Sequence, residues 1–415
     1  MSEPILLVAD KNNKTFDLPG YLACSASGGR ISVLAKDDLI PLPEGSDLFF
    51  LPDRNPVGFN TVPNIYEELE ELYPVAAFIP PGYTHLSTVA YKERPGAKIL
   101  PLFSYTPVAL YKGKFHVPAI RIDTRKNHNI CALDKSLLAR RIKTFQGTSN
   151  RLIRHLAGCA QTSFCPNAIN FFLGKYECPL PTSPACNARC LGCISYQPKG
   201  SCSATQPRLT FIPTAGEIAE IALLHIKNAR HPVVSFGQGC EGEPLLAANV
   251  IKEAVTMIRK KTTRGTIHMN TNASLTAQID ALCKAGIDSF RVSLNSTRKE
   301  PYQTYYMPRG YSFLDVYRSI LTAKHHKKFV ALNYLVMPGF TDREDEFKEL
   351  VELISKSKVD MIQWRNLNYD PLLYFKKMNV KPGERLLGIR SVVTQLRKKF
   401  PKLRHGYFNL PKESW

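Results

Sequence analysis

The sequence predicts an α/β fold in which parallel strands alternate with helices, preceded by a smaller β-rich region. Three observations indicate this fold. From about residue 175, short apolar runs alternate with helical patterns at a repeat of roughly 25–40 residues, as strand–helix–strand units require. Residues 1–125 contain only brief apolar runs between clusters of Pro, Gly and Asn, which is typical of short strands and turns. Residues 371–415 are basic and contain one amphipathic helical pattern.

The composition is that of a globular protein with a strongly basic surface. The chain has 415 residues, of which 44% are hydrophobic, enough for two or three domains with full cores. The net charge of +20 suggests an anionic partner such as a nucleic acid, nucleotide or acidic substrate, although a basic surface without such a partner is the simpler alternative. The sequence has neither a signal-peptide pattern nor an apolar run long enough to span a bilayer. We therefore expect a cytoplasmic protein without a membrane partner.

Changes in pattern along the chain predict four regions. Residues 1–125 should form a β-rich accessory domain, and residues 126–174 a basic helical linker that contains cysteines. Residues 175–370 should form the α/β domain, and residues 371–415 a basic C-terminal helix and tail. Nothing in the first region has catalytic spacing.

Six apolar runs predict the strands of the α/β domain. They lie at 176–180, 232–236, 266–270, 289–295, 329–336 and 361–365. Two helix starts between them carry capping boxes, Thr214 with Glu217 and Thr341 with Glu344. Parallel strands joined by helical crossovers form either a barrel or an open sheet, and in both the functional residues lie at the carboxyl ends of the strands.

A cysteine motif follows the first predicted strand. Cys186, Cys190 and Cys193 have C-x3-C-x2-C spacing in a chain of eleven cysteines. In a reducing compartment such closely spaced thiols favour metal ligation over disulfides. Thiolate suits zinc or an iron–sulfur cluster, but a structural zinc site needs four ligands, and no fourth Cys or His follows at zinc-finger spacing. Three thiolates on a four-iron cluster would leave one iron open to a ligand from outside the protein.

Each of the next four strands ends in a short motif that contains glycine or polar residues. The candidate site residues in these motifs are Gly242, Glu243, Pro244, Asn270, Ser293, Asn295, Met337 and Gly339. Glycines let backbone carbonyls approach an ammonium group closely, and apolar side chains beside a glycine suit a flat aromatic base. At the end of the sixth strand, the residues expected to face a substrate are Gln363, Trp364, Arg365 and Asn368.

The cysteine spacing and these motifs together resemble the radical S-adenosylmethionine (SAM) superfamily over residues 175–370. The resemblance implies a partial (β/α)6 TIM-type barrel in which the three cysteines hold a [4Fe-4S] cluster whose open iron is chelated by SAM. It implies that the segment Gly242-Glu243-Pro244, called the Gly-Glu-Pro edge below, binds the amino group of SAM. Ser293 and Asn295 would bind its ribose and carboxylate, Met337 and Gly339 would lie under its adenine, and Asn270 would belong to a strand end of the same site.

The resemblance also implies a reaction. An electron, from a donor such as flavodoxin or ferredoxin, passes through a low-potential cluster into the sulfonium of SAM. SAM is then cleaved to methionine and a 5′-deoxyadenosyl radical, which abstracts hydrogen from the substrate. We therefore expect an oxidoreductase or transferase-type enzyme that acts on a peptide or protein, a small metabolite or a nucleotide-like molecule, with no catalytic side chain identified.

Other interpretations of the cysteines stay open. Cys159, Cys165 and Cys202 bracket the triad at irregular spacing and could hold a second iron–sulfur cluster, or could be buried free thiols. The triad and the charge also fit an iron–sulfur or zinc-containing nucleic-acid-binding protein that does not cleave SAM. A further alternative is an ordinary (β/α) enzyme in which the cysteines are incidental.

Overall fold

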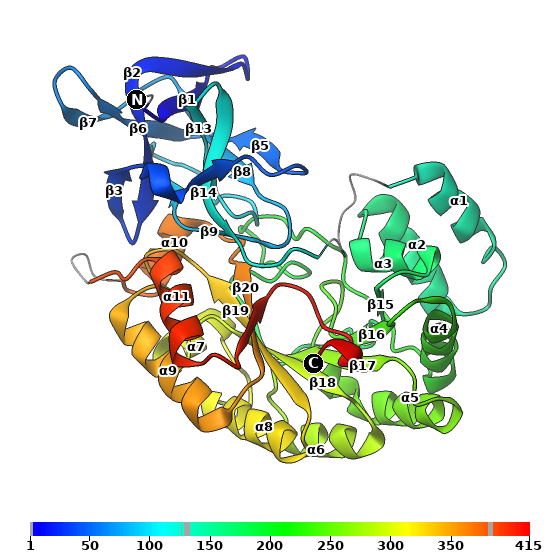
Figure 1. Ribbon diagram of the computed structural model, residues 1–415. Coiled ribbons are helices and arrows are strands. Elements are labelled where there is room, and N and C mark those ends of the chain that lie inside the picture. The colour runs from blue at the N-terminus through cyan, green and yellow to red at the C-terminus, as the bar shows by residue number, and fades with distance from the viewer. Residues whose placement is uncertain (1–2, 126, 128–132, 381–384) are drawn as a thin grey trace.

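The chain forms two sheets, one antiparallel and N-terminal, the other parallel and surrounded by helices (Figure 1). The structure is a computed structural model that describes residues 3–125, 127, 133–380 and 385–415. Residue 126, where we expected the helical linker to begin, lies outside the described residues. Within them, no helix combines the length and the apolar character needed to cross a bilayer.

The parallel sheet has seven strands. They are β15 (Glu177–Pro179), β16 (Val233–Phe236), β17 (Thr266–Thr271), β18 (Ser289–Leu294), β19 (Phe329–Val336), β20 (Met361–Asn366) and β21 (Arg404–Gly406). Each strand pairs in parallel with the next one along the chain, so the sheet curls in one direction as a partial barrel. This confirms the predicted fold class. The sheet gains a seventh strand, β21, beyond the six predicted.

Helices cover the outer face of the parallel sheet (Figure 1). They are α4 (Ala215–Asn228), α5 (Ala248–Lys261), α6 (Thr276–Ala285), α8 (Phe313–His325), α9 (Glu344–Ser357) and α11 (Ile389–Lys399). The short helices α7 (Lys299–Tyr306) and α10 (Pro371–Lys377) follow β18 and β20 and lie instead at the carboxyl ends of the strands. The buried sides of these helices and the strands share one apolar core, in which Ile218 of α4, Val234 of β16 and Ile251 of α5 are fully buried. Burial of this apolar area is the main force that holds the helices on the sheet.

The two predicted capping boxes have different outcomes. Thr214 caps α4 as predicted, because its side chain accepts from the Glu217 amide while Glu217 binds the Thr214 amide. The prediction for Thr341 is wrong. Helix α9 has Arg343 at its N-cap, and the Thr341 hydroxyl instead accepts from the Met337 amide within the preceding turn.

The N-terminal sheet is built from short antiparallel strands, which confirms the predicted β-rich region. Its strands are β1 (Ile5–Ala9), β2 (Thr15–Ser27), β3 (Arg30–Val33), β4 (Leu39–Pro41), β5 (Asp47–Phe50), β6 (Arg54–Asn60), β7 (Ile65–Glu68), β8 (Tyr73–Phe78), β9 (Tyr83–His85), β10 (Thr88–Val89), β11 (Tyr91–Glu93), β12 (Thr106–Pro107), β13 (Ala109–Tyr111) and β14 (Lys114–Arg121). The long strand β2 pairs with four others and organises the sheet.

This sheet docks on the carboxyl ends of β19 and β20. The Thr84 hydroxyl donates to the Trp364 carbonyl, and the His85 amide donates to the Asn366 side chain at 3.0 Å. At a second contact Gly28 lies against Gly339, both with positive φ, and a Cβ on Gly28 would stand only 2.9 Å from the Gly339 carbonyl oxygen. The N-terminal sheet therefore covers part of the barrel mouth.

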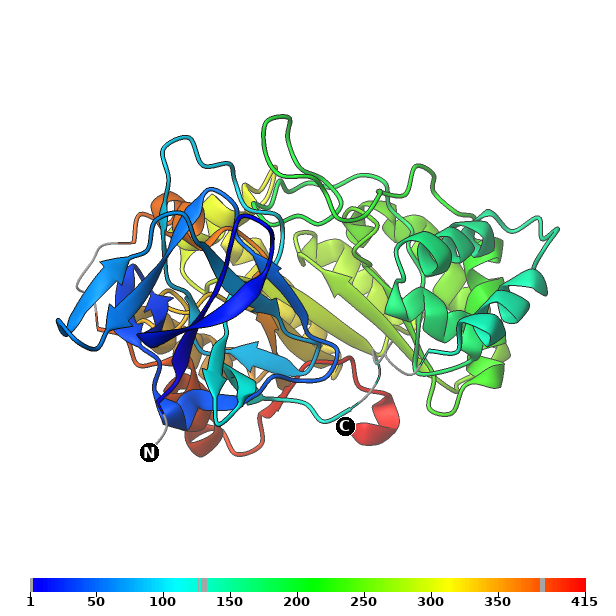
Figure 2. The same ribbon diagram turned by 90° about the horizontal axis from the view of Figure 1, so that it is seen from above.

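Three helices follow the N-terminal sheet in the sequence and lie on the side of the barrel mouth opposite that sheet (Figure 2). They are α1 (Lys135–Lys143), α2 (Arg151–Thr162) and α3 (Pro166–Leu173). Asn150 caps α2 by accepting from the amides of Leu152 and Ile153, and α3 begins with Pro166 and ends at the left-handed Gly174. The apolar sides of α2 and α3 join the core of the barrel.

Candidate active site

A cavity of about 390 Å³ opens at the carboxyl ends of the barrel strands. Its walls come from the loops after β15 and β16, from the ends of β17 to β20, and from Phe78, Pro81 and Ser104 of the N-terminal region. All three cysteines of the C-x3-C-x2-C motif line it, together with Gly242, Glu243 and Pro244. Because the carboxyl ends of the parallel strands meet at one end of the barrel, residues far apart in sequence come together here.

The loop that carries Cys186, Cys190 and Cys193, called the cysteine loop below, has no regular secondary structure. Hydrogen bonds to other parts of the chain hold it in place. The amides of Arg189 and Leu191 donate to the carbonyls of Tyr306 and Tyr305, at 2.9 and 3.0 Å. The Gln197 side chain donates to the carbonyls of Leu191 and Cys193. These external partners replace the ladder bonds of regular structure, so the loop can direct its thiols into the cavity.

Burial keeps two thiols of the triad protonated unless positive charge is bound beside them. Burial raises the pKa of the Cys186 thiol to about 11, and it raises the pKa of Cys190 well above its usual value, with the neighbouring thiols adding to the effect. Thiols in such a place ionise only when positive charge is supplied, as a metal or cluster does. Arg208 also approaches, with its Nη2 atom 3.5 Å from the Cys193 Sγ atom.

The Gly-Glu-Pro edge lies beside residues 183–185, which lead into the cysteine loop. The Gly242 amide donates to the Ser183 carbonyl at 2.6 Å, and the Glu243 amide donates to the Ala185 carbonyl at 2.8 Å. A Cβ on Gly242 would overlap the Ala185 carbonyl, so only glycine fits here. The approach of these two segments brings the Gly-Glu-Pro edge beside the residue that precedes Cys186.

Two buried glutamates fix this segment. Glu243 accepts from the Asn272 amide at 2.8 Å and from the Thr271 hydroxyl at 2.5 Å, and burial raises its pKa to about 7. Glu241 accepts from the amides of Thr182 and Ser183, and burial raises its pKa to about 7 as well. The sequence analysis missed Glu241. The available signal was a second acidic residue within a glycine-rich turn, a place where a carboxylate collects backbone donors.

Asn187, which the sequence analysis also missed, ties the cysteine loop to the end of β17. Its side-chain amide donates to the Ser274 hydroxyl at 2.9 Å, and its carbonyl accepts from the Asn272 side chain at 2.8 Å. Although serine is a common N-cap residue, Ser274 does not cap α6, which has Leu275 at its N-cap. The Ser274 hydroxyl serves the cysteine loop instead.

The predicted residues at the ends of β17 and β18 lie in the cavity wall. Asn270 and Ser293 both line it. The Asn270 side-chain amide donates to the carbonyls of Phe236 and Gly237, so this residue mainly holds the loop after β16. Ser293 accepts from the Asn333 side chain at 3.3 Å, and the two together present polar atoms to the cavity.

Three further predicted residues lie outside the wall of this cavity. Asn295 follows the last residue of β18 and is fully buried, and its amide donates to the Pro301 carbonyl and to the Tyr374 hydroxyl. Met337 is only 1% exposed and belongs to the core. Gly339 packs against Gly28 of the N-terminal sheet. The strand ends one residue before Asn295, so the alternation that would direct its side chain inward stops there.

Two arginines stand deeper in the barrel. Arg291 donates to the Gln363 side chain at 3.0 Å, and Arg365 donates to the Tyr407 carbonyl at 3.0 Å while its guanidinium lies 4.0 Å from the centre of the Tyr407 ring. Burial lowers the pKa of Arg291 to about 9, and the charge of Arg365 adds to this effect.

Within the part of the chain that the structure describes, these arginines have no acidic partner at ion-pair distance. Among the ion pairs of the described residues, none includes Arg291 or Arg365. The carboxylate of Glu177 acts on Arg291, but it is itself bonded to Ser235 and Asn409. The barrel interior therefore carries positive charge that its own carboxylates do not pair.

Of the four residues expected to face a substrate at the end of β20, two line the cavity and two are buried away from it. Arg365 and Asn368 line the cavity. Gln363 is buried and donates to the Phe408 carbonyl and to the Asn409 side chain. Trp364 is fully buried and stacks on His405.

The cysteines considered for a second cluster do not gather as a set. Cys159 lies beside His155 and Cys240, with their ligand atoms within 4.8 Å of one another. Cys165 lines the same smaller cavity of about 230 Å³ as Cys159 and Cys240. Cys202 is not in the wall of that cavity.

Comparison with known proteins gives one family match. Residues 180–354 match the family model described as the radical SAM superfamily. A search of curated proteins gives no match.

Several solved structures are similar in part. SuiB of Streptococcus suis bound to S-adenosylmethionine has 15% identity and a TM-score of 0.40, over 55% of this chain and 49% of SuiB. The FeFe-hydrogenase maturase HydG of Carboxydothermus hydrogenoformans has 14% identity and a TM-score of 0.39, over 65% of each chain. Methylornithine synthase (PylB) has 17% identity and a TM-score of 0.40, over 64% of this chain and 77% of that enzyme. The match thus spans about half the length of SuiB.

Proposed function

Residues 180–354 belong to the radical SAM superfamily, and we propose that the cavity at the barrel mouth is the site where this chain cleaves SAM to start a radical reaction. Enzymes of this superfamily use a [4Fe-4S] cluster and SAM. The observation that carries the proposal is the approach of the Gly-Glu-Pro edge to the segment entering the cysteine loop, with all three thiols in the wall of one cavity.

The residues present fit a cluster with one open iron. Cys186, Cys190 and Cys193 would supply three thiolates, and Arg208 beside Cys193 would offset part of the negative charge. All three residues line the cavity and its described lining includes no further Cys or His, so a fourth iron position would be open to a ligand that is not protein.

The wall next to the triad fits SAM. Backbone carbonyls near Gly242 suit an ammonium group, and Ser293 with Asn270 would offer polar atoms to the rest of the molecule. We assign Asn295, Met337 and Gly339 an indirect part, because they shape the ends of β18 and β19 without lining the cavity. When bound, the cluster supplies the electron that breaks a carbon–sulfur bond of SAM and yields a 5′-deoxyadenosyl radical for hydrogen abstraction.

The chain itself contributes enclosure and position. Phe78 and Pro81 of the N-terminal region stand in the cavity wall opposite the barrel loops, so residues 1–125 would act as an accessory domain that limits access of water. The electron would come from an external donor such as flavodoxin or ferredoxin.

We further propose that the substrate carries an anionic group, a carboxylate or a phosphate, that binds at Arg291 and Arg365. The Arg291 guanidinium is desolvated and its buried Nε atom has no hydrogen-bond partner among the described residues, which is costly, and an anion held between it and the partly exposed Arg365 would relieve that cost. Both arginines also line the smaller cavity, which contains none of the three triad cysteines. Because they also line the cavity of the triad, they lie where the two cavities adjoin, and a substrate that reaches from the smaller cavity toward the cluster would place its charge there.

The radical reaction is tested by anaerobic reconstitution with iron and sulfide, followed by dithionite and SAM. We expect about four iron per chain at the triad and formation of 5′-deoxyadenosine, and we expect Cys186→Ala, Cys190→Ala and Cys193→Ala each to abolish it. Cys283→Ala, at a buried cysteine of α6, is the control and should retain cleavage. Cleavage that persists in any triad variant would refute the assignment. Salt-sensitive RNA binding without 5′-deoxyadenosine would favour the nucleic-acid-binding alternative.

The anion site is tested separately with inorganic phosphate. We expect phosphate to raise the melting temperature of the wild-type protein and to have a much smaller effect on Arg291→Gln and Arg365→Gln. Arg397→Gln, at an exposed position of α11, controls for general charge effects and should respond like wild type. An equal response in all four proteins would contradict an anion site at the two arginines, while leaving the SAM cleavage assay unaffected.

A further inference from the structure

A second group of metal-ligating side chains lies outside the cavity of the cysteine triad. His155 and Cys159 belong to α2, and Cys240 belongs to the loop after β16. Their ligand atoms all lie within 4.8 Å of one another, and the His155 Nε2 atom is 3.5 Å from the Cys159 Sγ atom. We propose that His155, Cys159 and Cys240 form a structural zinc site, separate from the triad.

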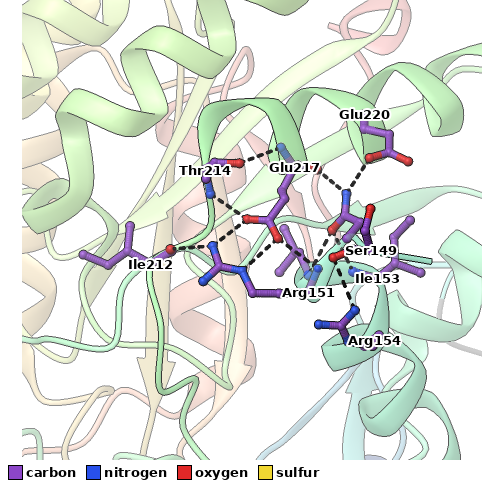
Figure 3. A network of polar contacts seen from close by, with 10 residues as sticks. Ser149, Arg151, Ile153, Arg154, Ile212, Thr214, Glu217 and Glu220 are labelled. Carbon is purple, nitrogen blue, oxygen red and sulfur yellow. Dashed lines mark hydrogen bonds and ion pairs between the residues drawn. The ribbon is translucent and has the colours of Figure 1, made fainter. Parts of the chain in front are cut away.

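The two elements that carry these ligands are fixed in place. His155 and Cys159 are four residues apart, so they lie on one side of α2. Helix α2 is clamped to α4 by Arg151, whose Nη2 atom is 2.7 Å from the Glu217 Oε2 atom (Figure 3). The Asn150 side chain adds bonds to the Glu217 carbonyl and to the Glu220 carboxylate.

The third ligand is held just as firmly. The Cys240 carbonyl accepts from the Leu209 amide at 2.7 Å. The adjacent Glu241 carboxylate accepts from the Gln238 amide at 2.7 Å and from the Thr182 amide at 2.7 Å. Cys159 is 8% exposed and Cys240 is 5% exposed, so both side chains are buried in the protein. The proximity of the three ligands thus follows from anchored backbone and not from mobile surface side chains.

The short distances between the three ligand atoms favour a single metal ion over an iron–sulfur cluster. With Zn–S near 2.3 Å and Zn–N near 2.0–2.1 Å, tetrahedral geometry places two sulfurs about 3.8 Å apart and a sulfur and nitrogen about 3.6 Å apart. The 3.5 Å between His155 and Cys159 already matches the second spacing. A multi-iron cluster would need its ligands spread around a larger core. The mixture of imidazole and thiolate is a usual ligand set for zinc.

A fourth ligand is available nearby. Cys165 lines the same cavity as Cys159 and Cys240, and its amide donates to the Cys159 carbonyl at 3.1 Å. Addition of this thiolate would give a closed set of three cysteines and one histidine, which is typical of structural zinc. The ion would join α2 to the loop that continues into Gly242, and so would stabilise that loop.

The test uses a chain in which the triad cannot bind metal. We would purify the Cys186→Ala, Cys190→Ala, Cys193→Ala triple variant from zinc-supplemented medium and measure metals by mass spectrometry. We expect about one zinc per chain. Adding His155→Ala, or Cys159→Ser with Cys240→Ser, should remove it, whereas adding Cys24→Ser with Cys283→Ser, at buried cysteines elsewhere, should not.

A second measurement covers variants that fold poorly. Chelation of zinc from the triple variant should lower its melting temperature, and zinc added back should restore it. His155 is only partly buried, so His155→Ala removes a ligand without opening the core. A folded triple variant without metal, iron with sulfide at this site, or zinc retained after loss of these ligands would overturn the proposal.

Discussion

At the scale of single residues, Gly242 shows how little freedom the site has. Its amide is bonded to the Ser183 carbonyl, and a Cβ at its position would overlap the backbone before Cys186. The Gly-Glu-Pro edge and the cysteine loop can be this close only because one side chain is missing. The spacing of the two segments is thus set by a residue with no chemistry of its own.

Gly242→Ala should therefore damage both stability and cleavage. The added methyl group has to displace backbone, which costs about 1–3 kcal/mol in unfolding free energy and separates the edge from the triad. Urea unfolding and the yield of 5′-deoxyadenosine measure the two effects. The control is Gly216→Ala in α4, where the nearest atom to the new Cβ is the Thr214 hydroxyl at 3.8 Å. A Gly242→Ala variant as active and stable as that control would show that the close approach is unimportant.

The sequence was most informative where spacing alone defines a group. The triad and the Gly-Glu-Pro segment are each contiguous, and both line the cavity. Asn295 and Gly339 could not be placed from sequence. The position of Asn295 depends on where β18 ends, and that of Gly339 on contact with Gly28, more than 300 residues earlier in the chain. Tertiary contacts of this kind leave no local pattern.

At the scale of elements, α4 shows how a helix is fixed to the sheet by one polar bond within apolar packing. The His225 Nε2 atom lies 3.1 Å from the Tyr176 carbonyl just before β15, and the ring is 1% exposed. Burial lowers the pKa of His225 to about 4. The folded chain therefore keeps this histidine neutral at pH values where the unfolded chain protonates it.

This histidine should make the fold sensitive to acid. As pH falls below about 6.5 the unfolded state binds a proton that the folded state does not take up until about pH 4, so stability is lost over that window. Between pH 7.5 and pH 5.0 the loss from this one group is about 2 kcal/mol. His225→Gln can still donate to the Tyr176 carbonyl without titrating.

The comparison is made by urea unfolding at both pH values. Wild type should lose about 2 kcal/mol more than His225→Gln on going from pH 7.5 to pH 5.0. The same change with pH in both proteins would mean that His225 is not the group responsible.

Most elements of the barrel were predictable because each strand is a short apolar run bounded by turn residues. The six predicted strands lie within about two residues of β15 to β20, within the usual error of strand ends. Strand β21 was missed because Arg404, His405 and Gly406 form no apolar run. This segment is extended because the edge of β20 offers it backbone partners.

At the scale of the whole molecule, the N-terminal sheet and the barrel are joined by a buried ion pair. Arg54 of β6 is 1% exposed and lies 3.2 Å from Asp370, which is 2% exposed and caps α10. Asp370 also accepts from the Leu100 amide. Arg54 also pairs with Glu93 of β11 at 3.0 Å, so a buried guanidinium held by two carboxylates joins the sheet to the barrel.

Asp370→Ala should loosen this connection strongly. Removal of Asp370 leaves the buried Arg54 guanidinium with the more exposed Glu93 as its remaining acidic partner and leaves the Leu100 amide without its acceptor, which costs about 1–3 kcal/mol. Unfolding free energy and proteolysis between the two regions report the effect. Arg390→Ala is the matched control, because Arg390 of α11 also pairs with the N-terminal region, at Asp38, but both of its partners are exposed and the expected cost is below about 1 kcal/mol. Similar losses in the two variants would contradict a special role for the buried pair.

The most direct test of the central claim is the electron paramagnetic resonance spectrum of the dithionite-reduced protein with and without SAM. If three thiolates of the triad hold a four-iron cluster with an open iron, SAM must become a ligand and change the g-values of the reduced cluster. We predict such a change in wild type and no cluster signal in Cys190→Ala. A cluster signal that SAM leaves unaltered, or one that survives in Cys190→Ala, would contradict the assignment of this cavity as a SAM-cleaving site.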